Sequence, residues 1–205
     1  MLIRIHPVNP QPRLIKQVAE ILRNDGVIAY PTDTIYGIGC SIYSKKGIDR
    51  IYELKGRDRK KPMSFICADL SDIARYAIVG NYAYRTMKRL LPGPYTFVLR
   101  ATKEVPRVMQ NRQQQVGIRV PDSPICLALV RELGHPIVTT SANLSGAEPM
   151  VDPEVIEHQW GKLLDVVIDG DILGGEPSSV VEIGDESAVV LRRGRGDVSL
   201  FEEAP

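Results

Sequence analysis

VIAYPTDTIYGIG, residues 27–39, is the stretch from which the fold can be worked out. Its first half is a short apolar run that ends in a turn, which predicts a buried strand over residues 27–32. Its second half is dense in hydroxyl groups, and Gly37 and Gly39 permit close approach of a ligand to the backbone. A loop of this kind after a strand can hold a polar ligand. The alternative is an ordinary turn capped by Thr32 and Asp33.

Helical and strand patterns alternate on both sides of this stretch. Apolar residues on one face, followed by Gly26 as a C-cap, predict a helix over residues 11–25. The alternation predicts one α/β domain over residues 1–205, built on a sheet with mixed strand directions. Residues 170–177 are expected to form a loop. Further helices are expected over residues 46–55, 81–91 and 124–133, and further strands over 63–67, 95–101, 116–120, 165–169, 178–183 and 188–193. Residues 136–143 are expected to form a strand and then a loop.

Composition and charge narrow the class of protein. A chain of 205 residues can bury a substantial core, and its net charge of +1 provides no overall attraction to nucleic acid or to a membrane. Its three cysteines and three histidines are well separated, which argues against a structural zinc site and favours reduced thiols. The N-terminus lacks a signal-peptide pattern, and no run of about 18 apolar residues is present. We therefore expect a soluble, cytoplasmic protein without a membrane partner.

A basic segment lies at residues 45–61, where eight Lys and Arg residues outnumber three Asp and Glu residues. It contains KGRDRKKP (55–62). If this loop is extended, Lys55 and Arg57 project on the same side, because side chains alternate with a period of two. Two such cations, with Lys60 and Lys61 nearby, suit the negative charge of a triphosphate. The alternative is a solvated basic loop without a ligand.

Three further segments carry polar side chains near predicted strands. VGIRVP (116–121) places Arg119 in an otherwise apolar strand, where a buried charge needs a protein or ligand carboxylate; the alternative is a side chain that faces solvent. TTSANLSG (139–146) offers donors to phosphate or ribose, unless it forms only an Asx turn. PSSVVEI (177–183) and LRRG, which contains Arg192, add hydroxyls and a cation.

No set of side chains for covalent catalysis can be assembled. His6 and His135 each adjoin a proline and are interpreted as structural histidines, and Cys67 follows a predicted strand and is assigned to the core. The chemistry that remains is done by positioning and by charge stabilisation.

Taken together, these segments resemble the YrdC/YciO family of threonylcarbamoyl-AMP synthases. The resemblance extends from about residue 10 to residue 197, and its markers are PTDTIYGIG, KGR with KKP, VGIRVP, TSANLSG, the SSVV strand and LRRG. It implies a twisted sheet with flanking helices and a large, basic concave cavity. It also implies the reaction of ATP, L-threonine and bicarbonate or CO2 to give threonylcarbamoyl-AMP and pyrophosphate, which serves tRNA threonylcarbamoyladenosine modification. Some members of the family bind double-stranded RNA or tRNA.

The same resemblance assigns roles to individual positions. Catalysis is expected of Lys55 and Arg57, which would stabilise charge on the phosphate oxygens together with Mg²⁺. No metal-binding residues are assigned, because no carboxylate cluster stands out. The residues expected to bind threonine are Thr34, Arg119, Ser141 and Ser178, and those expected to bind ATP are Lys55, Arg57, Lys61, Asn143 and Arg192.

The chain departs from the family pattern at two places. Ile66 stands where the family has a histidine that touches threonine, and GAEPMVD (146–152) replaces a Ser-Pro-Thr stretch. Together with CADLSDI (67–73), these departures indicate the YciO branch, in which activity is expected to be weaker or the substrate to differ. Two alternatives to the synthase follow. One is an RNA-binding protein that has kept the basic concavity without catalysis, and the other is the same chemistry on another amine.

Overall fold

The computed structural model describes residues 1–201, which form ten strands, six α-helices and two 3₁₀ helices. The α-helices are α1 (Pro12–Arg23), α2 (Lys45–Lys55), α3 (Leu70–Tyr76), α4 (Asn81–Leu90), α5 (Pro124–Leu133) and α6 (Pro153–Trp160). The strands are β1 (Leu2–Arg4), β2 (Ile28–Tyr30), β3 (Gly37–Ser41), β4 (Ser64–Ile66), β5 (Tyr95–Arg100), β6 (Gln115–Arg119), β7 (Ile137–Ser141), β8 (Val166–Asp169), β9 (Ser179–Ile183) and β10 (Ala188–Arg192). The 3₁₀ helices are η1 (Arg107–Met109) and η2 (Ser199–Phe201).

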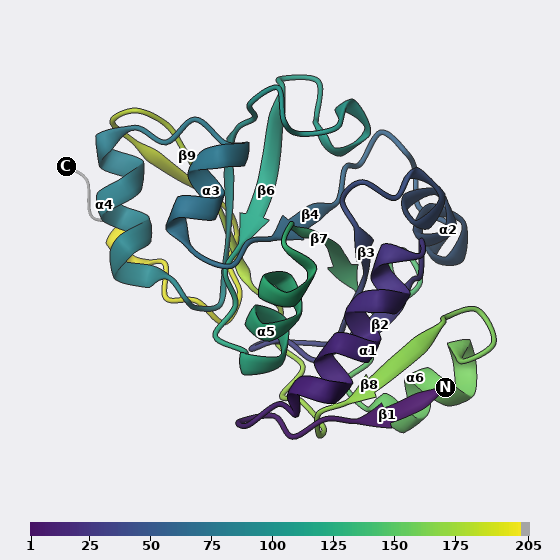
Figure 1. The fold of residues 1–205 in the computed structure, drawn as a ribbon. Coiled ribbons are helices and arrows are strands. Elements are labelled where there is room, and N and C mark those ends of the chain that lie inside the picture. The colour runs from purple at the N-terminus through teal and green to yellow at the C-terminus, as the bar shows by residue number, and fades with distance from the viewer. Residues whose placement is uncertain (202–205) are drawn as a thin grey trace.

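All ten strands belong to one sheet, in the order β1-β8-β2-β3-β7-β4-β6-β5-β9-β10 (Figure 1). Strands β4 and β6 are parallel, whereas β3 and β7 are antiparallel, so the predicted mixture of strand directions is confirmed. The order in the sheet differs from the order in the chain. Consequently, the turn before β3, the loop after β7 and the end of β6 come from distant parts of the sequence but are brought to neighbouring strands.

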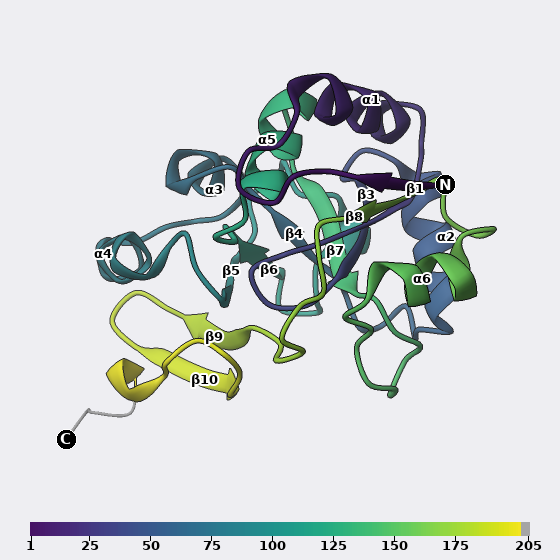
Figure 2. The same cartoon turned by 90° about the horizontal axis from the view of Figure 1, so that it is seen from below.

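The helices cover the two faces of the sheet unequally. Helices α1 and α5 lie together on one side of the strands, and α6 lies on the other (Figure 2). Under α1 and α5 is an apolar cluster that includes Val18, Leu129, Ile66 and Ile137. A larger cluster includes buried residues of α2, α3, α4 and α6. Burial of each such aliphatic side chain contributes about 1.5–3 kcal/mol, so the two clusters hold the sheet between its helices.

Local sequence explains why α5 begins and ends where expected. The Ser123 side chain accepts a hydrogen bond from the Cys126 amide, and Pro124 occupies the first turn. Gly134 ends the helix with φ of 80°, a left-handed conformation that glycine adopts without strain. The expected C-cap of α1 at Gly26 is wrong, because α1 ends at Arg23 and Asn24 is its C-cap.

The sequence patterns miss two strands, β1 and β3, two α-helices, α3 and α6, and both 3₁₀ helices. Strand β3 begins inside VIAYPTDTIYGIG, whose glycines the sequence pattern assigns to a loop. The structure gives them another role. A Cβ atom on Gly39 would lie 2.3 Å from the Val138 carbonyl oxygen of β7, so glycine is needed for the close approach of the two strands.

Candidate active site

A cavity of about 440 Å³ lies where the strands of the central sheet change from apolar to polar side chains. Ser64 of β4 and Thr139 of β7 line it, and they lie on the same face of the sheet as Ile66 and Ile137, because side chains alternate along a strand. The isoleucine ends of β4 and β7 belong to the apolar cluster with α1 and α5. The polar ends of the same strands therefore form the floor of the cavity.

One wall of the cavity is built around Arg119, at the end of β6. Its Nη2 donates to Asp33 Oδ1 at 2.8 Å and to Thr34 Oγ1 at 3.1 Å. The Arg119 and Asp33 side chains are each only 8% exposed, so this is a buried ion pair. Arg119 Nε is also buried and has no hydrogen-bond partner among residues 1–201. The prediction that Arg119 faces either solvent or a carboxylate is thus resolved in favour of a carboxylate, supplied by the protein itself.

Asp33 connects three segments at this wall. Besides Arg119, its carboxylate accepts a hydrogen bond from the Asp122 amide at 3.1 Å, and its backbone carbonyl accepts one from Arg195 Nη1 at 2.7 Å. The turn after β2, the end of β6 and the segment after β10 are therefore held together by one residue. Sequence reasoning interpreted Asp33 only as a turn cap, since nothing in the local pattern relates it to Arg119.

Ser178, which directly precedes β9, and Arg192, at the end of β10, line the same cavity as Arg119. Arg192 donates to the Ser178 carbonyl oxygen, at 2.7 Å from Nη2, and the Ser178 hydroxyl is 2.8 Å from Thr96 Oγ1. Burial, and secondly the charge of Arg119, lowers the pKa of Arg192 from its ordinary value. Two guanidinium groups thus approach one another at a wall where Asp33 neutralises Arg119, which leaves positive charge available to an anion.

The basic loop contributes a third cation to the cavity. Helix α2 ends at Lys55, and Gly56 turns the chain in a left-handed conformation with φ of 56°. The expected extended loop is therefore wrong, and Lys55 and Arg57 are related by a turn. Arg57 lines the cavity, and its guanidinium is fixed by the Lys61 carbonyl at 2.9 Å and the Pro62 carbonyl at 3.1 Å.

Lys55 points in another direction, into the loop that follows β7. Its ammonium donates to the Ser141 carbonyl at 2.5 Å, the Asn143 carbonyl at 2.7 Å and Asn143 Oδ1 at 2.9 Å. Ser141 and Asn143 both line the cavity, and Ser141 Oγ donates to Asn143 Oδ1 at 2.6 Å. Burial, and secondly Arg57, lowers the pKa of Lys55 to about 8.

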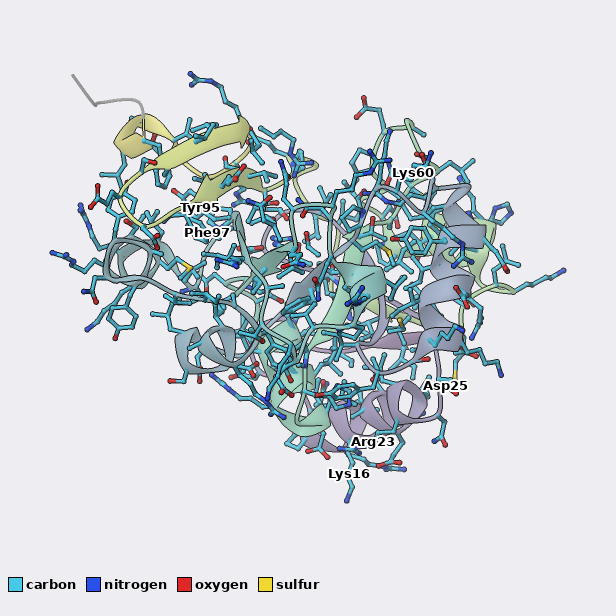
Figure 3. The ribbon with its side chains drawn as sticks, turned by 90° about the horizontal axis from the view of Figure 1, so that it is seen from above. Lys16, Arg23, Asp25, Lys60, Tyr95 and Phe97 are labelled. Atoms are coloured by element: carbon cyan, nitrogen blue, oxygen red, sulfur yellow. The ribbon has the colours of Figure 1, made fainter. Side chains whose placement is uncertain are left out.

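Besides Lys55, three further cation or hydroxyl residues singled out in the sequence lie outside the cavity lining. Thr34 is fully buried behind Arg119, and Lys61 is exposed. Lys60, labelled in Figure 3, is exposed too and lies on the opposite side of the molecule from Lys16 and Arg23 of α1. Their roles toward ATP or threonine stay predictions.

Ile66, which replaces the expected histidine, is fully buried in the apolar cluster under α1 and α5. The side chain at this position therefore does not reach the cavity.

Sequence reasoning also missed part of the cavity floor. Ser64, Thr96 and Gly117 lie on neighbouring strands and line the cavity. A Cβ atom on Gly117 would lie 2.4 Å from Ser64 Oγ, so the absence of a side chain on β6 keeps this hydroxyl in place. The period-two alternation from Arg119 back to Gly117 could have identified this position.

Residues 1–201 show neither a cluster of metal ligands nor a membrane-spanning helix. They contain no group of three or more His, Cys, Asp or Glu side chains arranged to hold a metal ion. None of their helices combines the length and the apolar character that crossing a membrane requires.

The fold and the cavity together define a single-domain α/β protein whose polar cavity is lined by arginines and hydroxyl groups. The chain belongs to the Sua5/YciO/YrdC family, whose model, described as "Telomere recombination", matches residues 20–194. It is 44% identical to the uncharacterized protein YciO of Escherichia coli over 199 residues, which cover 96% of this chain and 97% of that protein.

Two threonine-related proteins are also similar to the chain. A threonylcarbamoyl-AMP synthase of Nitrosococcus oceani is 34% identical, over 83% of this chain and 92% of that protein. The crystal structure of P. abyssi Sua5 complexed with L-threonine superposes with a TM-score of 0.88 at 28% identity, covering 95% of this chain and 57% of that one. The crystal structure of E. coli YciO superposes with a TM-score of 0.93 at 43% identity and 98% coverage of both chains. The predicted family is confirmed.

Proposed function

We propose that this protein is a threonylcarbamoyl-AMP synthase-like nucleotidyltransferase that uses ATP, L-threonine and bicarbonate or CO2. The observation that carries the proposal is the presence of two groups of cations in one cavity. Arg119 and Arg192 form one group, and Arg57, on the loop after α2, forms the other. A cavity with two separate cationic positions suits two anionic substrates, a carboxylate and a polyphosphate.

The Arg119 wall is assigned to the amino acid. The planar guanidinium matches a carboxylate, and Arg119 has donors left after Nη2 binds Asp33 and Thr34. Ser178 adds a hydroxyl within the same wall. The crystal structure of P. abyssi Sua5 with L-threonine supports a small amino acid as the ligand class in this family.

The loop wall is assigned to the nucleotide, with Arg57 on the phosphates. In the proposed reaction, the threonine amine adds to CO2 and loses a proton, which gives a carbamate. A carbamate oxygen then bonds to the α-phosphorus, the bond from that phosphorus to the bridging oxygen breaks, and pyrophosphate leaves with the electron pair. The side chains of the protein form no covalent bond. They orient the two substrates and stabilise the negative charge on phosphate oxygens.

Mg²⁺ is proposed to enter with ATP. Since residues 1–201 offer no carboxylate cluster for a metal, the ion would be held by phosphate oxygens and water, as is common for magnesium. It supplies positive charge to the polyphosphate. The product is an activated carbamate, so its proposed use is transfer to tRNA for threonylcarbamoyladenosine formation in the cytoplasm.

The test is pyrophosphate release from Mg-ATP with every combination of bicarbonate and L-threonine, using Arg57→Ala as the control with weakened nucleotide binding. Release that needs all three substrates is expected. Release with another amino acid in place of threonine would keep the chemistry and change the substrate. ATP binding without release under any condition would contradict a synthase. The alternative, a non-catalytic member that binds double-stranded RNA or tRNA, predicts RNA binding that weakens steeply with salt.

A further inference from the structure

Lys55 is buried beside the cavity, although its sequence position suggests a phosphate ligand. It is 2% exposed, and it is not among the residues that line the cavity. An ammonium group has three donors and no acceptor. All three are directed at oxygen atoms of residues Ser141 and Asn143, at 2.5–2.9 Å. No donor of Lys55 is therefore left for a phosphate oxygen.

The backbone of Lys55 holds the same loop. Its carbonyl oxygen accepts a hydrogen bond from the Ser145 amide at 3.0 Å. Residue 55 thus makes four hydrogen bonds to residues 141–145, far away in the sequence. Because Lys55 is the last residue of α2, the loop after β7 is attached to the end of a helix.

This attachment determines the direction of the hydrogen bonds in the cavity wall. Since a lysine ammonium only donates, the Asn143 atom that faces it must be the carbonyl oxygen Oδ1, which orients the whole amide. The Asn143 Nδ2 group then donates to the Ala147 carbonyl. Oδ1 also accepts the hydroxyl proton of Ser141, at 2.6 Å. The one proton of Ser141 Oγ is thereby used, and its lone pairs remain for a ligand.

We propose that Lys55 is a positioning residue rather than a phosphate ligand, and that it makes Ser141 Oγ a hydrogen-bond acceptor in the cavity. Such an acceptor selects a ligand group that carries a proton, namely the N–H or O–H of a small amino acid, and disfavours an anionic oxygen. The nature of this ligand rests on the proposed function. The orientation of the loop does not, because it follows from contacts within the protein.

The first experiment tests the loop without any substrate. Hydrogen–deuterium exchange is compared for wild type, Lys55→Met and Arg57→Ala in the ligand-free protein. Lys55→Met is expected to speed exchange in residues 141–150 by about tenfold or more, since it removes three charge-assisted hydrogen bonds. Arg57→Ala, the matched loss of a neighbouring cation, should leave this segment unchanged. Unchanged exchange in Lys55→Met would overturn the positioning role.

A second variant covers the case in which Lys55→Met does not fold. Asn143→Ala removes the side-chain acceptor of Lys55, together with the bonds of this amide to Ser141 and Ala147, and leaves both backbone acceptors of Lys55. It is expected to speed exchange in the same segment by a smaller factor, and no change there would also count against the proposal.

The second experiment separates the two kinds of ligand. Lys55→Met and Ser141→Ala are each expected to raise the threonine KM by about tenfold, with ATP affinity changed less than about threefold, and their effects should not add. Arg57→Ala should instead weaken ATP binding. An equal loss of ATP affinity in Lys55→Met and Arg57→Ala would overturn the proposal. If the wild type releases no pyrophosphate, the proposed function fails, while the exchange experiment still decides the role of Lys55.

Discussion

Lys55 and Arg119 are two buried cations beside the same cavity, but their charges are balanced in different ways. Arg119 is paired with the Asp33 carboxylate, and both side chains are almost completely shielded from solvent. Lys55 has no carboxylate among its hydrogen-bond acceptors, which are two backbone carbonyls and one amide oxygen. The first arrangement is an ion pair. In the second, the charge is stabilised only by hydrogen bonds to neutral acceptors.

The difference shows what each cation can offer a ligand. Arg119 lines the cavity and uses only its Nη2 on protein groups, so the guanidinium retains hydrogen-bond donors for a ligand there. All three N–H donors of the Lys55 ammonium group are used in hydrogen bonds within the protein. A charge near a cavity therefore predicts ligand binding only when its donors are still available for a ligand.

The largest effect is expected from breaking the ion pair. Arg119→Met would leave the Asp33 carboxylate buried without its cation, which costs about 3–5 kcal/mol of the free energy of unfolding. Urea denaturation at neutral pH measures this quantity. The matched control is Arg119→Met with Asp33→Asn, which removes both charges. It should be less destabilised than the sum of the single variants. Additive losses would mean that the two side chains do not act as a pair.

A smaller loss of stability is expected from Ile66→His, which places a polar ring among the apolar residues under α1 and α5. Ile66 is paired with Arg119 in the register of β4 and β6 but lies at the apolar end of its strand. Burying an imidazole without a hydrogen-bond partner costs about 1–3 kcal/mol, and more below pH 6, where the free imidazole is charged. Ile66→Met is the control, with a loss under about 1.5 kcal/mol. A histidine that left stability unchanged and raised threonine-dependent turnover would show that this position does reach the cavity.

Much of this fold could be predicted from the sequence because its longer elements have clear patterns. Helix α5 has a capping serine, a proline in the first turn and a terminal glycine, all local features. Strand β3 has none of these, since its glycines are explained only by the close approach of β7. The residues of the site also differ in whether a local pattern reveals them. Arg119 stands out as a charge in an apolar strand, whereas its partner Asp33 lies 86 residues away in an ordinary-looking turn.

The role of Lys55 could not be predicted for a related physical reason. In the sequence, it heads a run of cations, and an extended loop would direct it and Arg57 to one side. The left-handed conformation of Gly56 separates their directions. Whether a cation is available to a ligand depends on backbone turns and on acceptors that are distant in sequence, and neither is visible in a local pattern.

The third prediction concerns Arg57, the cation of the loop that lines the cavity. Its guanidinium is oriented by two backbone carbonyls, and no described acidic group pairs with it. Arg57→Ala should lower ATP affinity by roughly tenfold to hundredfold, because hydrogen bonds to charged groups contribute about 1.5–3 kcal/mol. Calorimetric titration with Mg-ATP measures this, and Arg59→Ala, an exposed neighbour paired with Asp49, is the control. Equal losses in both variants would indicate general attraction by the loop instead of a specific contact.

The last prediction concerns the pH dependence of stability that comes from Lys55, for which the expected change per pH unit is small. Its pKa is lowered from 10.5 to about 8 by burial and by Arg57. Between these two values the unfolded chain keeps a proton that the native protein has released. The contribution of Lys55 to the free energy of unfolding must therefore rise with pH through this window, by at most about 1.4 kcal/mol per pH unit. The difference in stability between wild type and Lys55→Met, followed from pH 7.5 to 10.5 by urea denaturation, removes the contributions of other groups. A difference that stayed constant would mean that the neutral dipoles around Lys55 hold its charge as well as water does, and the contrast with Arg119 would then lie in hydrogen bonding alone.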